Sequence, residues 1–252
     1  VINLLYEQLN LNRTYDNKYT EENIDLSKEF LKNIEIKGLY YTYEYGSEIL
    51  SNINLKIDKG DYVGIIGKTG AGKSTLINIL LGLLIPKKGD FSLDGKKYSI
   101  QERKWKTLFG YVPQDIFLID DTIKNNIAFG IADNEIDNTK LNFAINESMT
   151  SEFLNKLPNK ENTQIGQNGI RLSGGQKQRI GIARALYHNP EILIFDESTS
   201  SLDNDTEKYV LNSINRLSSK KTVIFITHRL SSLKFCNKIF ELSNGSLLTK
   251  SR

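Results

Sequence analysis

Cysteine and long apolar runs are what this sequence most clearly lacks. Its 252 residues include one cysteine, Cys236, so no disulfide can form within the chain, as expected in a reducing compartment. The longest apolar stretch, Leu76–Ile85, contains Asn78 and falls short of the roughly 20 residues that cross a bilayer. We therefore expect no transmembrane helix in this chain, and no signal peptide is visible.

An excess of charge of one sign is also missing. The net charge is +3, and the lysines are scattered among acidic residues without a polybasic block. This pattern indicates a solvated surface and gives no reason to expect nucleic acid as a partner. With 39% hydrophobic and 25% charged residues, the composition is that of a globular protein, either one large domain or a domain with an inserted lobe.

Alternating strand patterns predict an antiparallel β subdomain near the N-terminus. The runs Ile34–Tyr43 and Glu48–Ile57 predict one antiparallel pair, with Gly46 between them. Phe91–Tyr98 predicts a second hairpin, folded at Asp94-Gly95. Before them, residues 1–33 are mostly polar with an apolar-spaced start, which predicts a helix followed by a linker.

Three continuous apolar runs are typical of buried parallel strands: Tyr62–Ile66, Ile192–Phe195 and Thr222–Ile226. A loop and a helical segment follow each run, which favours an α/β core with right-handed crossovers. We expect Ile192–Phe195 to lie directly beside Tyr62–Ile66. Between these strands the strand pattern disappears, and helix-like spacing predicts a helical lobe at about residues 116–172.

A glycine-rich loop follows the first of these strands and opens a helix. Its residues fit the pattern G-x-x-x-x-G-K-[ST]: Gly67, Lys68, Thr69, Gly70, Ala71, Gly72, Lys73 and Ser74. Glycines let backbone N–H groups converge on phosphate oxygens at a helix N-terminus, which already favours anions. Lys73 is expected to reach the β- and γ-phosphates of ATP, and the Ser74 hydroxyl to bind Mg²⁺. The alternative, a plain glycine turn with an exposed lysine, fits this strand–loop–helix context poorly.

Two acidic residues, Asp196 and Glu197, end the second apolar run. Beside the phosphate-loop strand, Asp196 would lie near the metal, and Glu197 would reach the water that attacks the γ-phosphate. Adjacent acids alone more often cap a strand or lie in a surface turn. Their position after four apolar residues, in a chain with a phosphate loop, favours the catalytic interpretation.

A second glycine turn, Leu172-Ser173-Gly174-Gly175-Gln176, feeds a helix predicted over Gln176–Tyr187 that stops before Pro190. Its exposed N–H groups and the Ser173 hydroxyl would form a second anion site at a helix N-terminus. On its own, the same turn would be better explained as a helix cap.

In their order, these motifs resemble those of the ATP-binding cassette (ABC) family over residues 34–252. Tyr43 matches the aromatic residue that stacks on adenine, Gln114 the Q-loop glutamine, and His228 the switch histidine. The other motifs are Walker A at Gly67–Thr75, the LSGGQ signature at Leu172–Gln176, Walker B at Ile192–Glu197 and the D-loop at Ser200–Asp203.

The resemblance implies that two such domains pair head to tail, with each ATP between Walker A of one copy and the signature of the other. Gln114, Lys73, Glu197 and His228 would act in hydrolysis, although position alone also allows His228 to cap a strand. ATP would contact Tyr43, Gly67–Thr75 and Gln114 of one copy, and Ser173, Gly174, Gly175 and Gln176 of the other. Asp203 would also contact the nucleotide. Mg²⁺ would be held by Ser74, Gln114 and, through water, Asp196.

Two segments are similar to the exporter branch of the family: Ile116–Phe129, and Thr163–Gly169, where Gln167 replaces the usual acid. This similarity implies that residues 1–33 are a linker from a transmembrane domain, with residues 34–252 at the cytoplasmic face of a membrane. Within exporters, Ile119–Gly130 and Asn168–Arg184 are similar to flippases of lipid-linked oligosaccharides.

Three alternatives within the family remain: the ATPase subunit of an importer, a non-transport ATPase acting on DNA or ribosomes, and a clamp that binds ATP without hydrolysing it. The linker disfavours the importer subunit, and the absence of sustained heptads disfavours the DNA-repair type. The presence of Glu197 and His228 disfavours the clamp.

Overall fold

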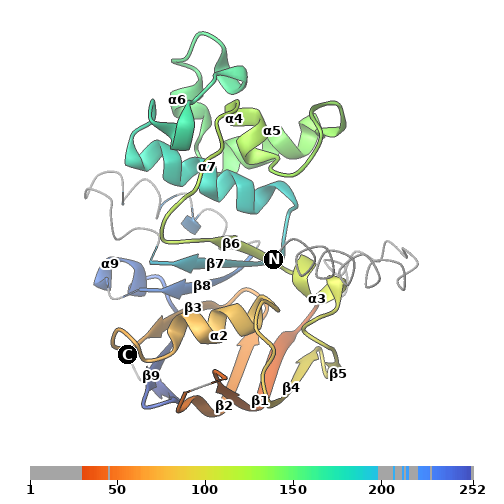
Figure 1. Ribbon diagram of the computed structural model, residues 1–252, viewed down its shortest axis with the longest axis vertical. Helices are drawn as coiled ribbons and strands as arrows, with labels where there is room; N and C mark the ends of the chain where they lie inside the picture. Colours follow the sequence, from red (N-terminus) through yellow and green to blue (C-terminus); the bar gives the residue numbers. More distant parts are fainter. Residues whose placement is uncertain are drawn as a thin grey trace, which may run out of the picture.

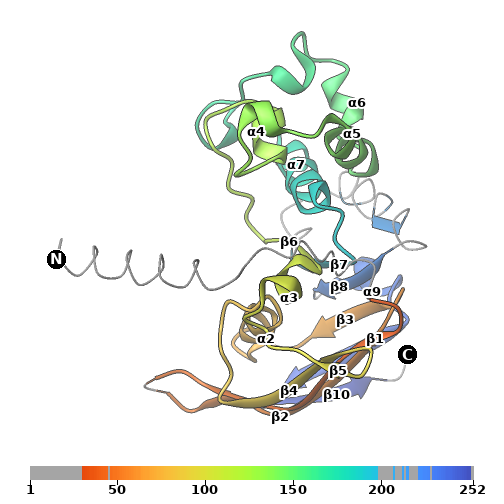
Figure 2. The same ribbon diagram turned by 90° about the vertical axis from the view of Figure 1, so that its right-hand side faces the viewer.

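The computed structural model describes residues 30–250 apart from 45, 198–206, 208–211, 213, 216–220 and 228. Two sheets and a group of helices make up this part of the chain (Figures 1 and 2). The strands are β1 (Asn33–Thr42), β2 (Glu48–Asp58), β3 (Tyr62–Ile66), β4 (Lys88–Leu93), β5 (Lys96–Lys97), β6 (Phe109–Val112), β7 (Ile192–Asp196), β8 (Thr222–Ile226), β9 (Lys238–Ser243) and β10 (Ser246–Lys250). The α-helices are α2 (Lys73–Leu80), α3 (Arg103–Thr107), α4 (Ile123–Ile127), α5 (Asn138–Glu147), α6 (Ser151–Leu154), α7 (Gly174–Tyr187) and α9 (Leu230–Leu233).

The predicted antiparallel strands are confirmed in a four-stranded sheet of order β2-β1-β4-β5. Ile34 lies opposite Ile57 and Ile36 opposite Leu55, and all four side chains are buried. β4 and β5 join at Asp94-Gly95, whose φ angles of 52° and 85° are those of a tight hairpin turn. This sheet lies at the opposite end of the molecule from α4, α5 and α6 in both views (Figures 1 and 2).

The predicted parallel strands are also confirmed, in a six-stranded sheet of order β10-β9-β3-β8-β7-β6. The expectation that β7 adjoins β3 is wrong, because β8 pairs with both of them and lies between them. All three are short apolar runs, so their composition does not say which are neighbours. Because the three strands are parallel, their carboxyl ends still meet at one edge of the sheet.

Strands β6, β9 and β10 were not predicted from the sequence. β6 has four residues and includes Gly110, which weakens a strand pattern. The glycine is required by packing: a Cβ there would lie 2.6 Å from the carbonyl oxygen of Ala185 and 2.7 Å from Cγ of Pro190. The end of α7 therefore approaches β6 too closely to allow a side chain.

Side chains of the six-stranded sheet alternate between two separate apolar cores. Ile192 and Ile194 of β7 belong to the core that α2 shares with the antiparallel sheet. Leu193 and Phe195 belong to the core that contains the apolar residues of α5 and α7. Helices α2 and α7, which follow the two glycine turns, therefore lie on opposite faces of this sheet (Figures 1 and 2).

Helices α4, α5 and α6 come between β6 and α7, where the sequence predicts a helical region. Thr122 caps α4 and Asp137 caps α5 through their side-chain oxygens. The hydroxyl of Tyr187 in α7 accepts the backbone N–H of Asp137 at 2.9 Å. In the described part of the chain, no helix has the length and apolarity needed to span a membrane.

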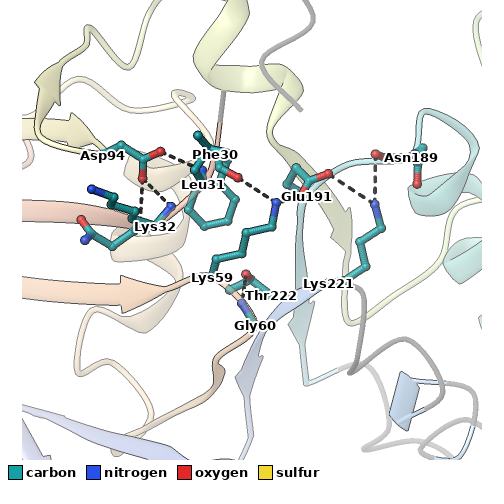
Figure 3. A network of polar contacts seen from close by, with 11 residues as sticks. Phe30, Leu31, Lys32, Lys59, Gly60, Asp94, Asn189, Glu191, Lys221 and Thr222 are labelled. Atoms are coloured by element: carbon teal, nitrogen blue, oxygen red, sulfur yellow. Dashed lines mark hydrogen bonds and ion pairs between the residues drawn. The ribbon is translucent and has the colours of Figure 1, made fainter. Parts of the chain in front are cut away.

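Polar contacts tie the first described residues to the domain (Figure 3). The Asp94 carboxylate accepts the backbone N–H groups of residues 31–33 at 2.7 to 2.8 Å. The Lys59 ammonium donates to the carbonyl of Phe30 at 2.8 Å and pairs with Glu191 at 3.1 Å. The Phe30 side chain is fully buried. Residues 30–33 are thus held at the β4–β5 turn by Asp94, and by Lys59, which also pairs with Glu191 just before β7.

Candidate functional site

The phosphate loop, residues 67–72, is shaped by glycines that no other residue could replace without strain. Gly67, Gly70 and Gly72 have φ angles of 155°, 81° and 99°. A Cβ at Gly67 would lie 2.3 Å from the carbonyl oxygen of Leu242 in β9. Gly72 is the N-cap of α2, so the loop delivers the chain directly into a helix N-terminus. The loop is therefore held by β9 on one side and by its own helix on the other.

Lys73 is buried within this loop, with 7% of its surface exposed. Its ammonium donates to the carbonyl oxygens of Gly67 at 2.6 Å and Lys68 at 3.2 Å. The loop tip, Lys68, Thr69 and Gly70, is exposed to solvent. A buried cation among backbone groups at a helix N-terminus creates a positive site that suits a phosphate chain.

Tyr43, the predicted adenine-stacking residue, reaches the same helix from the end of β1. Its hydroxyl lies 3.1 Å from the Thr75 hydroxyl in the first turn of α2. The Tyr43 ring packs edge-on against Tyr41, with 4.9 Å between centroids, and 45% of its surface is exposed. Ser74, the predicted metal ligand, is exposed beside Thr75. The structure therefore brings Tyr43, Ser74 and the phosphate loop together.

A hollow of about 420 Å³ opens beside the loop tip. Its walls are Lys68–Ala71, the start of β2 at residues 47–49, and the β9–β10 turn at residues 241–245. Lys73, Ser74 and Tyr43 are not among its walls, so the hollow borders the loop tip and not the whole predicted site. The β9–β10 turn was missed in the sequence, although Asn244-Gly245 between apolar residues is a hairpin signal that could have revealed it.

Asp196 and Glu197 lie where β7 ends, as the sequence predicts. Burial raises the pKa of the Asp196 carboxyl; the Tyr111 hydrogen bond lowers this pKa, Glu197 raises it, and the charge of Lys73 lowers it. The charge of Lys73, in the phosphate loop, therefore acts on the Asp196 carboxyl at the end of β7. Glu197 has a φ of 44°, a left-handed conformation that costs a non-glycine residue about 1 kcal/mol or more. Lys160 has the same φ of 44°, so this conformation alone does not mark Glu197 as catalytic.

The three predicted metal-binding residues suit Mg²⁺ by their chemistry. Ser74 offers a hydroxyl, Gln114 an amide oxygen and Asp196 a carboxylate. Gln114 is exposed just after β6, which pairs with β7 up to Val112 opposite Phe195. The described residues contain no cluster of three or more His, Cys, Asp or Glu that could cage a metal. One carboxylate with neutral oxygens is the donor set that Mg²⁺ uses when substrate phosphates complete its coordination.

The LSGGQ turn caps α7 in a regular way. The Ser173 hydroxyl accepts the Gln176 N–H at 3.4 Å, and the Gln176 side chain accepts the Ser173 N–H at 2.9 Å. This reciprocal capping box is what the helix-cap interpretation of the turn predicts. Ser173 and Gly174 are exposed, and Gly175 is buried. The turn lies on the other face of the sheet from the phosphate loop, so the structure does not bring these two predicted anion sites together in one chain.

Two predicted site residues, Asp203 of the D-loop and His228, lie outside the described residues. On either side of His228, the Arg229 N–H donates to the Thr227 hydroxyl at 3.0 Å. The Arg229 side chain pairs with Glu207 at 2.7 Å, and Glu207 is largely buried.

The chain is similar to a known protein family and to individual members of it. The family model described as "ABC transporter" matches residues 50–200. Over 219 residues the chain is 40% identical to the alpha-hemolysin translocation ATP-binding protein HlyB of Escherichia coli O157:H7. Over 221 residues it is 42% identical to the ATP-dependent lipid A-core flippase of Coxiella burnetii. Each match covers 86% of this chain, but 31% and 37% of the respective relative.

A solved structure of a bacterial Atm1-family ABC exporter with ATP bound is also similar. The TM-score is 0.76 at 34% sequence identity, and the match covers 86% of this chain and 38% of that chain. The chain thus spans about a third of the length of these relatives.

Proposed function

This chain belongs to the ABC transporter family as an exporter-type nucleotide-binding domain that hydrolyses ATP, and we propose that it drives export by ATP-dependent head-to-tail dimerisation. One observation carries the proposal: the phosphate loop and the LSGGQ turn are both helix N-termini, yet they lie on opposite faces of one sheet. A phosphate chain bound at one of them is out of reach of the other. A second copy, turned head to tail, supplies the missing half.

Within this sandwich we assign the chain's residues to distinct tasks. Backbone N–H groups of residues 67–72 and the Lys73 ammonium bind the β- and γ-phosphates. Ser74 and Gln114 would hold Mg²⁺ directly and Asp196 through water, and the bound metal would neutralise phosphate charge. Glu197 accepts a proton from the attacking water, and His228 orients that water and the γ-phosphate.

Ser173 and the glycines of the second copy would close the site and exclude bulk water. Tyr43 would stack on adenine, and Asp203 would line the interface between the copies. The exposure of Ser173 and Gly174 supports this assignment, since a surface that waits for a partner must be open in the single chain.

The finer part of the proposal concerns the membrane and the cargo. We propose that residues 1–33 lead from a transmembrane domain of the same polypeptide, that residues 34–252 lie at the cytoplasmic face of a membrane, and that residues near 116–172 form the helical lobe. The relative from Coxiella burnetii is a lipid A-core flippase, which supports a lipid-linked saccharide or another amphipathic cargo. The relative from Escherichia coli O157:H7 is a hemolysin translocation protein of similar identity. Stimulation of the full-length protein's ATPase by lipid-linked saccharide but not by polypeptide would separate these two.

The dimer is tested by Ser173→Arg in a Glu197→Gln background, which slows hydrolysis. We expect unchanged ATP binding by the monomer and loss of the ATP-dependent dimer peak in gel filtration, because the arginine fills the turn that faces the partner's phosphates. Asn142→Arg, an exposed position of α5, adds the same charge elsewhere on the helical lobe and should leave the dimer intact. A dimer that survives Ser173→Arg, or a Glu197→Gln protein that stays monomeric with ATP, contradicts the head-to-tail arrangement.

A further inference from the structure

A tyrosine outside the recognised motifs contacts the Walker B aspartate. The hydroxyl of Tyr111 in β6 donates a hydrogen bond to Oδ2 of Asp196 in β7 at 3.0 Å. The strand register explains why these side chains meet. Tyr111 lies opposite Ile194, so Asp196, two residues further along β7, lies on the same face and diagonally across from it.

The hydroxyl of Tyr111 is not needed to fill space. The ring is partly buried and packs against the apolar core under α2, which a phenylalanine would serve equally well. The phenol is the donor of this bond, because an ionised carboxylate can only accept hydrogen bonds. A donor aimed at a carboxylate that is itself partly buried fixes that carboxylate in one orientation.

Resting on the proposed function, we propose that Tyr111 is a positioning residue for the magnesium site: it holds Oδ2 of Asp196 and leaves Oδ1 for the water shell of the metal. Hydrogen bonds that orient the direct ligands of a metal typically contribute about 10- to 100-fold to metal affinity. Because Asp196 would act through water, we expect the lower end of this range. The same bond fixes the end of β6 to the end of β7, three residues before Gln114. Tyr111 therefore sets the geometry between the two strand ends that carry predicted metal-binding residues.

The test is Tyr111→Phe, which removes one oxygen atom and keeps the ring. ATP affinity is measured by titration calorimetry in EDTA. In separate samples without EDTA, Mn²⁺, which is visible by electron paramagnetic resonance, is titrated into the ATP-loaded protein. We expect ATP affinity in EDTA to match the wild type and Mn²⁺ affinity to fall by about 10-fold. An unchanged Mn²⁺ affinity overturns the inference. An equal loss of both affinities also overturns it, because that result would mean general damage to packing.

Tyr187→Phe is the matched control, since it removes another buried tyrosine hydroxyl that has a hydrogen-bond partner, in this case the Asp137 N–H. Both affinities should stay at wild-type values. In addition, Tyr111→Phe should weaken Mn²⁺ binding no further in an Asp196→Asn protein, because the tyrosine acts through that carboxylate. A further loss of Mn²⁺ affinity in the double variant would show that Tyr111 does not act through Asp196.

The outcome is separable from that of the proposed function. If the wild-type protein binds ATP and Mn²⁺ and dimerises as expected while Tyr111→Phe changes nothing, only the role of Tyr111 is lost. If the wild-type protein binds no ATP, the proposed function itself fails.

Discussion

The phosphate loop and the LSGGQ turn are both glycine-rich helix N-termini, but they are built in opposite ways. In the phosphate loop, three glycines have positive φ angles, Leu242 presses against Gly67, and Lys73 is buried among backbone carbonyls. The LSGGQ turn has an ordinary N-cap, with Ser173 at a φ of −70°, and a Cβ at Gly174 would meet nothing within 4 Å.

This difference separates a site that is complete in the single chain from one that is completed by a partner. The phosphate loop already holds its shape, cation and helix end before any ligand arrives, so it can bind a phosphate chain alone. The LSGGQ turn offers N–H groups on an open surface where water competes for every contact. We therefore expect changes in the first to affect folding and nucleotide binding, and changes in the second to affect mainly association.

Glu197→Gln should give the largest effect and make the two regions observable together. Losing the general base should slow ATP turnover by about 10² to 10⁴, which is about 3 to 5 kcal/mol of barrier. ATP binding should persist, so the ATP-bound dimer should accumulate in gel filtration. Steady-state hydrolysis at the wild-type rate would remove Glu197 from the mechanism.

The glycines of the two turns should respond oppositely to an added methyl group. Gly67→Ala should destabilise the domain by about 3 kcal/mol, because the Cβ meets a backbone oxygen at a strained φ angle. ATP binding should be lost with it. Gly174→Ala should leave the melting temperature and the monomer's ATP affinity unchanged, because the added methyl has open space. Equal melting temperatures for the two variants would contradict the comparison.

Replacing a lysine near each turn should show the same contrast in ATP affinity. Lys73→Met should weaken ATP binding about 10- to 100-fold, as expected for losing a charged hydrogen bond of about 1.5 to 3 kcal/mol. Lys177→Met in α7 removes an ammonium that binds the Asn168 carbonyl at 2.8 Å, and it should leave the monomer's ATP affinity unchanged. Isothermal titration calorimetry measures both, and similar affinities would show that the loop does not depend on its buried cation.

The smallest effect is expected from Ser173→Ala. Losing the side-chain cap should destabilise α7 by about 1 kcal/mol, which lowers the melting temperature by about 2 to 4 °C in a domain of this size. ATP affinity of the monomer should not change, because the phosphate loop lies on the other face of the sheet. A loss of monomer binding would mean that the two turns communicate within one chain.

Features that depend on nearby residues were predictable from the sequence. The phosphate loop, the hairpin at Asp94-Gly95 and the carboxylates after β7 each follow from a few adjacent residues, because turn geometry and strand burial act locally. The helical region between β6 and α7 also followed from its spacing.

Features that depend on pairing between distant segments were not predictable. The insertion of β8 between β3 and β7, and the approach of the β9–β10 turn to the loop tip, arise from sheet order. The bond from Tyr111 to Asp196 joins residues 85 positions apart, and the strand register that creates it has no local signature. The orientation of the two glycine turns relative to each other likewise depends on which core each helix joins.

The polar contacts around Asp94 have a practical consequence for where the domain can be shortened. The Phe30 ring is fully buried, and Lys59 donates a hydrogen bond to its carbonyl oxygen. A protein trimmed to begin at residue 34 would leave an apolar socket open to water and a carboxylate without the three amides that now surround it. A protein trimmed to begin a few residues before Phe30 keeps this side chain buried. It should therefore resist protease and aggregation better than the shorter form.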